Sequence, residues 1–285
     1  MSSDVKSAAR TLRRVPRAAE RPPEIDDAAD TQYVAAVGRA LQVLEAFRPG
    51  DEPMGNAEIA ERTGLPKPTV SRLTYTLAQC GYLSYDTRRR DYELGGGALA
   101  LGAAALSRRN VRSIARPLMR ALARDRAFNV GLGTRDRLSM IYTDACEGGA
   151  LIGLRLYAGS RIPMLTSAMG RAYLAGLDAA ERDALLEELR PQHGSEWATL
   201  LKGVERARRD VERRGFCTSA GEWQKDIHGV AAPVRTPDGG RVFAVNLGGP
   251  AYMLPLKLLD EELGPRIAGI ARQIESALAP STDTV

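Results

Sequence analysis

The fold of the first half of the chain is decided by residues 56–80, which read NAEIAERTGLPKPTVSRLTYTLAQC. Two short amphipathic segments flank Gly64, and Ala60 lies one helical turn before it. A small residue at Ala60 lets a second helix cross closely, and glycine at 64 permits the positive φ of a tight turn. Val70 and Leu73 then recur at helical spacing, so that one face of the second segment packs and the other stays free. This spacing predicts a helix-turn-helix.

The free face of the second segment carries side chains that suit contacts with DNA. Hydroxyl, lysine and arginine groups reach phosphates and base edges. We expect five residues to contact double-stranded DNA: Lys67, Thr69, Ser71, Arg72 and Tyr75. Thr69, Ser71 and Arg72 are predicted to lie nearest the base edges, whereas Lys67 and Tyr75 are predicted to meet phosphate.

A helix before this pair and a hairpin after it complete the predicted domain. The helix rests on apolar residues at helical spacing, namely Val37, Leu41, Leu44 and Phe47. The hairpin pairs residues 82–85 with residues 92–94 around a polar turn. Its tip carries Arg88, Arg89 and Arg90, which can enter a minor groove or hold phosphates. Helices followed by a hairpin define a winged helix-turn-helix.

The composition permits two domains and a nucleic-acid partner. A chain of 285 residues is long enough for two cores. Its net charge of +5 is only mildly basic, so the charge distribution is more informative. Between residues 67 and 90, five bases face a single acid. Such a local excess supplies the sequence-independent part of DNA affinity through counterion release.

Cysteines and apolar stretches limit the other possibilities. The three cysteines are far apart and form no CxxC pair, so we expect neither a disulfide framework nor a structural zinc site. Residues 98–106 are apolar but much shorter than the ~20 residues that span a bilayer. The first residues lack the apolar core of a signal peptide. We therefore expect a cytoplasmic protein with no membrane partner, metal or cofactor.

The rest of the chain divides into a tail, a linker and a second domain. Residues 1–30 lack apolar periodicity and are expected to be a disordered tail, followed by the winged helix-turn-helix at 31–95. The Ala- and Leu-rich residues 96–112 predict a linker helix. In residues 113–280, predicted strands, one of them at 151–157, group at both ends around helices, and a helix at 256–278 closes the chain. This order predicts an α+β domain with helices on a sheet.

Short motifs in both halves carry a resemblance to a known family. In the first half they are AEIA at 57–60, GLPKPTVSRL at 64–73, GYL at 81–83 and YELG at 92–95. In the second half they are GSRIP at 159–163, GRA at 170–172, RGF at 214–216, VAAPV at 230–234 and GP at 249–250. In this order, over residues 33–279, the chain resembles the IclR-family transcriptional regulators. The resemblance implies a winged helix-turn-helix, a linker helix and a GAF- or PAS-like effector domain. It also implies homodimers or homotetramers on a pseudo-palindromic operator and a small-molecule effector, often from carbon or aromatic catabolism.

The resemblance also implies where the effector binds. In related regulators that bind small acids, amides at a helix N-terminus hold an anionic oxygen, and the matching positions here are Ala168 and Met169. Where those regulators have an acid, a cysteine and two serines, this chain has Ser219, Gly229, Asn246 and Gly248. The two glycines leave room for a ligand larger than glyoxylate or pyruvate. Trp223 could stack on an aromatic ring, and further polar candidates are His228, Glu222 and Arg155.

Other chemistries have weaker support in the sequence. Gly95, Gly97 and Ala100 match the dinucleotide pattern GxGxxA, but no βαβ unit follows. Cys217 near His228 could act as a thiol nucleophile, but a buried structural cysteine is the better explanation. We therefore expect no catalytic residues. The alternative function is a small-molecule-binding or catalytic domain whose winged helix binds another protein.

Overall fold

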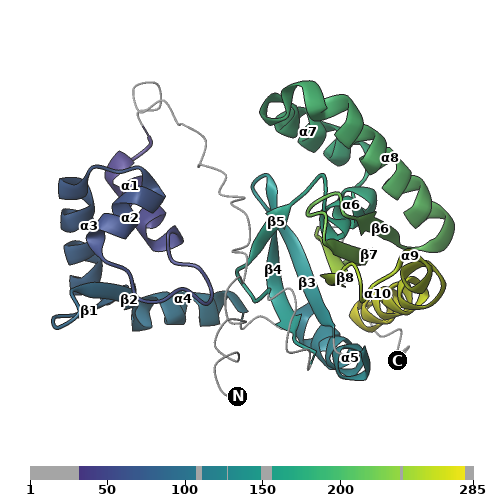
Figure 1. The fold of residues 1–285 in the computed structure, drawn as a ribbon, viewed down its shortest axis with the longest axis horizontal. Coiled ribbons are helices and arrows are strands. Elements are labelled where there is room, and N and C mark those ends of the chain that lie inside the picture. Colours follow the sequence, from purple (N-terminus) through teal and green to yellow (C-terminus); the bar gives the residue numbers. More distant parts are fainter. Residues whose placement is uncertain (1–31, 107–110, 127, 149–155, 238–239, 280–285) are drawn as a thin grey trace, which may run out of the picture.

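The computed structural model describes residues 32–106, 111–126, 128–148, 156–237 and 240–279. Figure 1 shows a small domain of helices and a hairpin at one end and a larger domain built on a sheet at the other. Helix α4, Gly96–Leu106, leads from the small domain towards the larger one (Figure 1). The predicted α+β class is therefore confirmed, whereas the predicted tail at 1–30 lies outside the described residues.

The small domain is a winged helix-turn-helix. Its elements are α1 Ala35–Glu45, α2 Asn56–Thr63, α3 Lys67–Gln79, β1 Leu83–Asp86 and β2 Asp91–Leu94. Helix α2 ends at Gly64, whose φ of 73° lies in the left-handed region, as the sequence predicts. Pro68 occupies the first turn of α3, where no N–H donor is required. Met54 forms an isolated antiparallel β-bridge with Tyr92 of β2. The sequence did not indicate this extra pairing beside the wing.

Only part of the apolar stripe predicted for α1 packs into the core of the small domain. Leu44 and Phe47 pack against the buried cluster that contains Ile59 and Val70. Val37 and Leu41, from the same predicted stripe, are instead 56% and 54% exposed. One side of α1 thus builds the domain, while the other presents apolar surface to its surroundings.

The junction between wing and linker explains the GxGxxA pattern without a nucleotide. A Cβ atom on Gly95 would lie 2.5 Å from the carbonyl oxygen of Gly81, so only glycine permits this approach. The amide of Gly97 donates to that carbonyl oxygen at 2.9 Å, and the amide of Gly95 donates to Tyr82 O at 2.8 Å. The glycines therefore seat α4 against the wing.

The larger domain is a six-stranded antiparallel sheet in the order β5-β4-β3-β8-β7-β6. Its strands are β3 Asn129–Asp136, β4 Ser139–Cys146, β5 Arg161–Pro163, β6 Cys217–Ala220, β7 Ile227–Arg235 and β8 Val242–Pro250. Its main helices are α5 Val111–Arg126, α6 Ala168–Gly176, α7 Ala179–Leu189, α8 Trp197–Arg214 and α10 Gly264–Leu278. Short 3-10 turns at Arg190–Gln192 and Gly194–Glu196 join α7 to α8.

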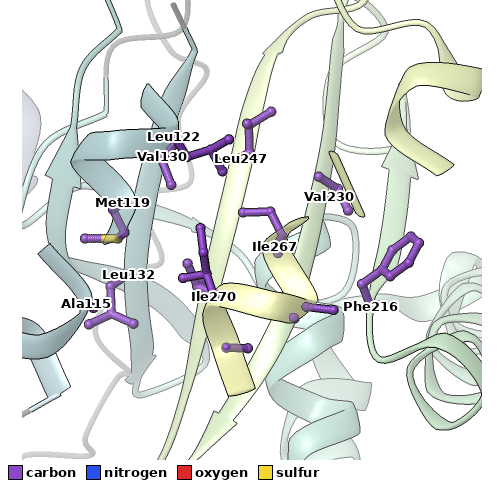
Figure 2. Close-up of a cluster of buried hydrophobic side chains, with 14 of the residues drawn as sticks. Ala115, Met119, Leu122, Val130, Leu132, Phe216, Val230, Leu247, Ile267 and Ile270 are labelled. Atoms are coloured by element: carbon purple, nitrogen blue, oxygen red, sulfur yellow. The ribbon is translucent and has the colours of Figure 1, made fainter. Parts of the chain in front are cut away.

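One face of the sheet forms a dry core with α5 and α10. Figure 2 shows Met119 and Leu122 of α5 and Ile267 and Ile270 of α10 meeting side chains that the strands direct to this face. Along β8, Phe243, Val245 and Leu247 belong to this core, while the residues between them face the other way. This period of two is what an antiparallel strand buried between two layers requires.

The opposite face carries small residues that let α6 approach the sheet. A Cβ atom on Gly131 would lie 2.2 Å from the Tyr142 ring, and one on Gly133 would lie 2.4 Å from the sulfur of Met169. Helices α7 and α8 complete the layer outside α6. Because glycines stand at these two positions of β3, the Tyr142 ring and Met169 of α6 can lie against the centre of the sheet.

Two sequence predictions for this domain need correction or lie outside the description. The closing helix predicted for residues 256–278 is interrupted, because α9 Leu256–Leu258 passes through a π-helical turn at Leu259–Leu263 before α10. The sequence contains no proline or glycine inside that turn that would have signalled it. The strand predicted at residues 151–157 falls mostly outside the described residues, and β4 pairs with β3 on one side and with β5 on the other.

Candidate DNA interface and effector site

Helix α3 presents its predicted contact residues to the surroundings while its other face holds the domain together. Lys67, Ser71, Arg72 and Tyr75 are exposed, and Thr69 is half-buried. On the packed face, the Thr74 hydroxyl donates to Asn56 Oδ1 at 3.0 Å and so ties α3 to the start of α2. The spacing of these groups matches a helix that can enter a major groove.

The tip of the wing is shaped by Asp86. Its carboxylate accepts hydrogen bonds from the backbone amides of Arg89, at 3.1 Å, and Arg88, at 2.7 Å, and these bonds lower the pKa of Asp86. Arg90 follows with a φ of 57°, which closes the turn. The guanidinium of Arg89 pairs with Asp91 at 3.1 Å. Of the three arginines predicted to contact DNA, Arg88 and Arg90 therefore have the freer side chains.

All eight residues predicted to bind the effector line one cavity between α6 and the sheet. They are Ala168, Met169, Ser219, Trp223, His228, Gly229, Asn246 and Gly248. Sequence reasoning missed Tyr142, Ile162, Ser167 and Ile227, which also line it and give no motif signal. The cavity volume is about 20 Å³, enough for roughly one water molecule. An organic ligand therefore requires the cavity to open.

The start of α6 directs hydrogen-bond donors at this cavity. Ser167 caps the helix, because its hydroxyl accepts from the amide of Gly170 at 3.1 Å and donates to Pro163 O at 2.5 Å. The amides of Ala168 and Met169 occupy the first two helical positions and have no carbonyl partner within the helix. Together with the positive end of the helix dipole, they suit an anionic oxygen.

The sheet side of the cavity contains a buried amide with unused capacity. Asn246 Nδ2 donates to the Tyr142 hydroxyl at 2.9 Å, and Tyr142 is fully buried, which raises the pKa of its phenol. Asn246 Oδ1 is buried with no hydrogen-bond partner among the described residues. His228 Nδ1 lies 2.8 Å from Leu254 O, a contact that leaves Nε2 available. A neutral, polar wall thus faces the helix amides.

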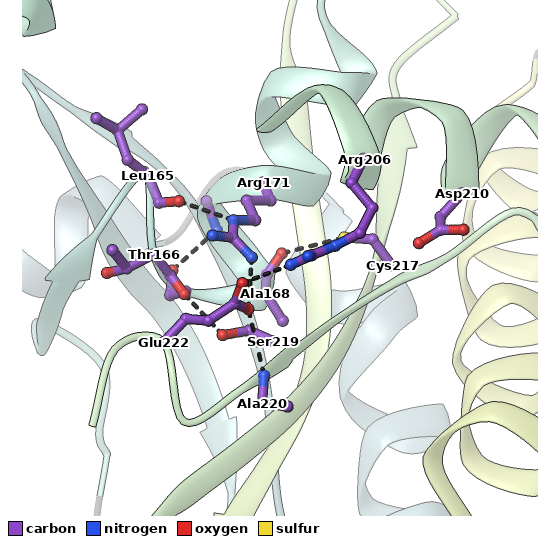
Figure 3. A network of polar contacts seen from close by, with 12 residues as sticks. Leu165, Thr166, Ala168, Arg171, Arg206, Asp210, Cys217, Ser219, Ala220 and Glu222 are labelled. Atoms are coloured by element: carbon purple, nitrogen blue, oxygen red, sulfur yellow. Dashed lines mark hydrogen bonds and ion pairs between the residues drawn. The ribbon is translucent and has the colours of Figure 1, made fainter. Parts of the chain in front are cut away.

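Glu222 has a structural role instead of lining the cavity. Figure 3 shows it between two arginines, and Arg171 Nη1 donates to its carboxylate at 2.6 Å while Arg206 binds the other oxygen. Arg171 is only 3% exposed, and its Nε donates to Leu165 O at 2.8 Å. This network, the Arg171 network, joins α6, α8 and the loop that carries Trp223. Arg155, the other polar candidate, lies outside the described residues.

Cys217 has the environment of a structural cysteine. It is fully buried, and burial raises the pKa of its thiol to about 12. Its sulfur lies 3.6 Å from Ala168 O, which it can reach as a weak donor. Among the residues that the structure describes, no group of histidine, cysteine and acidic side chains could hold a metal ion. No helix in the same part of the chain has the length and apolar character needed to cross a membrane.

The Arg171 network predicts an acid-sensitive contribution to stability. Burial alone would raise the pKa of Glu222, but the hydrogen bonds and charges of Arg171 and Arg206 hold it below its usual value. A carboxyl with a lowered folded-state pKa stabilises the fold above its unfolded pKa and loses that contribution as the pH falls through the folded value. We expect Glu222→Gln to lower the free energy of unfolding by about 1–3 kcal/mol at neutral pH.

Chemical denaturation of the wild type and of Glu222→Gln from neutral pH to below about pH 4 measures this contribution. The difference between the two proteins should shrink as the pH falls. Asp183→Asn is the control, because Asp183 is 70% exposed and, within the part of the chain that the structure describes, its carboxylate contacts only Arg182, at 3.4 Å. A difference for Glu222→Gln that stays constant over this range would contradict the assignment.

These two sites, on separate domains, define a class of protein: a DNA-binding regulator that carries a small-molecule cavity. The family described as the IclR helix-turn-helix domain matches residues 36–87, and the family described as bacterial transcriptional regulator IclR C-terminal matches residues 103–276. The chain belongs to the IclR family of transcriptional regulators. Its relatives are regulators, and the chain is not an enzyme.

Individual relatives agree with this assignment along most of the chain. The HTH-type transcriptional regulator TsaQ1/TsaQ2 of Comamonas testosteroni is 34% identical over 250 residues, which are 87% of this chain and 90% of the relative. The crystal structure of an IclR-family regulator from Brucella abortus is 43% identical and superposes with a TM-score of 0.71, over 87% of this chain and 94% of that one. An IclR homologue from Microbacterium hydrocarbonoxydans, crystallised with 4-hydroxybenzoate, shares the fold at 21% identity and a TM-score of 0.68, over 85% and 98% of the two chains.

Proposed function

We propose that this regulator reads a pseudo-palindromic operator in the cytoplasm and is controlled by a small carboxylate, most simply an aromatic acid from catabolism. The observation that carries the proposal is the convergence of all eight predicted effector residues on one cavity at a helix N-terminus. The exposed face of α3 on the separate small domain supplies the DNA contacts. Effector binding then shifts the equilibrium between two arrangements of the DNA-binding domains by its differential affinity for them.

On DNA, α3 lies in a major groove with Thr69, Ser71 and Arg72 nearest the bases. Lys67 and Tyr75 meet phosphates, and Arg88 and Arg90 hold the adjacent backbone or minor groove. Nuclease protection of the DNA upstream of the gene tests this arrangement. Two protected half-sites separated by a whole number of helical turns, about 10 base pairs or a multiple, support a symmetric dimer. A single, asymmetric protected patch would contradict it.

The lining of the cavity favours a carboxylate with an aromatic body. None of the described residues that line it is a lysine or arginine, so among them an anionic oxygen depends on the amides of Ala168 and Met169. Trp223 offers a ring face, and the unpaired Oδ1 of Asn246 accepts from a ligand hydroxyl. The homologue crystallised with 4-hydroxybenzoate binds a ligand with these groups, which supports the same class here. Thermal-shift screening of aromatic hydroxy acids and aliphatic keto acids tests the choice, and a shift by the keto acids alone would overturn it.

The surface of α4 supports a dimer. This helix of 11 residues, GGALALGAAAL, has no polar side chain, and Leu99 and Leu101 are 75% and 59% exposed. An apolar surface of this kind is unfavourable in water, and a second copy of α4 would cover it. Because α4 leads from the DNA-binding domain to the sheet domain, pairing there would also set the distance between two copies of α3.

We expect a Leu99→Glu and Leu101→Glu double variant to be largely monomeric, because two buried carboxylates would face their symmetry mates. Sedimentation equilibrium measures the mass. Leu99→Met with Leu101→Met is the control and should remain dimeric, since methionine keeps the apolar volume. Should the glutamate variant keep the mass of the wild type, the dimer contact lies elsewhere.

A further inference from the structure

A second and larger cavity lies at the other end of α6. Its volume is about 320 Å³, within the usual range for small-molecule sites and far above the volume of the effector cavity in this structure. It is lined by the end of β3, the C-terminal half of α6, the start of α7 and the start of β8, through Thr134, Arg135, Arg137, Tyr173, Leu177, Glu181, Gly240, Arg241 and Val242. None of the predicted effector residues belongs to it.

The charges of this lining select an anion. Three guanidinium groups and the carboxylate of Glu181 line the cavity. Two of the guanidiniums also pair with glutamates outside the lining, Arg135 with Glu188 and Arg137 with Glu45, so Arg241 carries the charge that is left for a ligand. Arg135 is held in place, because its Nε donates to Arg137 O at 2.6 Å and its Nη2 pairs with Glu188 at 2.7 Å. Arg241 is exposed, and its guanidinium has no partner among the described residues, while its backbone amide is fixed by Thr236 Oγ1 at 3.1 Å. A free cation on a fixed backbone is available to a ligand.

Two further features orient the site. Arg137 adopts a φ of 55° at the two-residue turn between β3 and β4, a conformation that costs a non-glycine residue stability and is held only by its surroundings. The ring of Tyr173 is buried at 8% exposure, and its hydroxyl has no partner among the described residues. The turn thus places the guanidinium of Arg137 at the cavity, and the hydroxyl of Tyr173 can donate a hydrogen bond to a ligand there.

The C-terminus of α6, the negative end of its helix dipole, lies near this cavity but is neutralised by an arginine, so it does not repel an anion. Arg235 covers it, because its Nε donates to Gly176 O at 2.9 Å and its Nη2 donates to Ala175 O at 3.1 Å. These bonds satisfy the last carbonyls of the helix with a cation. The positive charge of Arg241 therefore stays available to a ligand.

We propose that this cavity binds a small organic anion with at least two negative charges and a hydroxyl, as a second ligand site distinct from the effector cavity. The negatively charged oxygens meet Arg241 and the Arg135–Arg137 turn, and the hydroxyl donates to Glu181. Leu177 and Val242 contact the carbon skeleton. Polycarboxylates and phosphate monoesters share this chemistry, and the experiment separates them.

Isothermal titration of the full chain with citrate, glycerol 3-phosphate and acetate, at constant ionic strength, tests the site. We expect citrate or glycerol 3-phosphate to bind and acetate not to bind. Whichever of the two binds with the higher affinity shows whether the site prefers a carboxylate or a phosphate. Arg241→Gln should weaken binding about tenfold or more, because it removes a charged hydrogen-bond partner. Tyr173→Phe should weaken it less.

Two controls separate this proposal from the proposed function. Arg209→Gln removes an exposed arginine on α8 and should bind the anion like the wild type. Ala168→Pro, which alters the effector cavity, should also leave anion binding unchanged. Equal binding of acetate and citrate, or unchanged affinity in Arg241→Gln, would overturn the second site and leave the effector cavity and the DNA interface unaffected. Loss of citrate binding in Ala168→Pro would assign the anion to the effector cavity.

The second site also has a direct contact with the DNA-binding domain. Arg137 Nη2 lies 3.2 Å from Glu45 Oε1, at the end of α1. A dianion that engages Arg137 competes with Glu45, so binding at this site should change operator affinity, a consequence that rests on the proposed function. Glu45→Gln should remove the effect of citrate on operator affinity and should tighten citrate binding, because the carboxylate that competes for Arg137 is gone. Persistence of the full effect in Glu45→Gln would exclude this contact as the route.

Discussion

Arg72→Ala should weaken operator binding about 10- to 100-fold and relax the sequence preference, because a bidentate arginine contact with a base contributes ~1–3 kcal/mol of discrimination. Arg72 is exposed on α3, and its guanidinium has no partner among the described residues. It therefore reaches DNA without first breaking an internal bond. Fluorescence anisotropy with operator and scrambled duplexes measures both affinity and preference.

The wing should act differently from α3. Arg88→Ala with Arg90→Ala removes phosphate contacts, so we expect the slope of log affinity against log salt to fall by about two, with little change in sequence preference. Arg89→Ala should have a smaller effect, since Arg89 pairs with Asp91. Arg209→Ala, an exposed arginine on α8, is the control. If Arg72→Ala and the wing variant bind like the wild type, the DNA interface is wrongly placed.

Ala168→Pro should abolish most of the response to a carboxylate effector while preserving the fold. Proline has no N–H, and the first position of a helix is where it is best tolerated. Ser167, the preceding residue, already has the extended backbone that proline requires, with ψ of 150°. The substitution therefore deletes one of the two amides that would hold the carboxylate. Losing a hydrogen bond to a charged group corresponds to a decrease in effector affinity of about 10- to 100-fold.

Ala168→Gly is the matched control, because it keeps the N–H and removes only a methyl group. Effector affinity is measured by titration calorimetry, and DNA binding without effector is measured in parallel. Ala168→Pro should bind DNA normally and respond weakly, whereas Ala168→Gly should respond like the wild type. Equal effector affinity in both variants would show that the helix amides do not hold the ligand.

The helices of the small domain were predictable because their ends leave local signals. Gly64 at a left-handed turn and Pro68 in the first turn of α3 each reflect the backbone at one position. It was not predictable which apolar residues of the α1 stripe are buried. Val37, which is exposed, and Phe47, which packs against the core, follow the same helical spacing in the sequence. Periodicity identifies an apolar face but does not reveal what covers it.

The effector cavity was predicted from family resemblance, and its partners could not be predicted from spacing. Tyr142 on β4 reaches Asn246 on β8 across β3, although the two residues are distant in sequence, and no motif records that pairing. Glu222 was a polar candidate, like His228, because it lies near Trp223 in the sequence, but the buried Arg171 on α6 binds it instead. Side chains that act across the sheet depend on tertiary contacts, which a single sequence does not display.

Titration of the full chain against the DNA upstream of its own gene, at low ionic strength and with or without aromatic acids, tests the central claim most directly. We predict specific binding that weakens steeply with salt and shifts by about tenfold or more when an effector is present. Absence of binding to every upstream fragment, with and without the acids, would contradict the account.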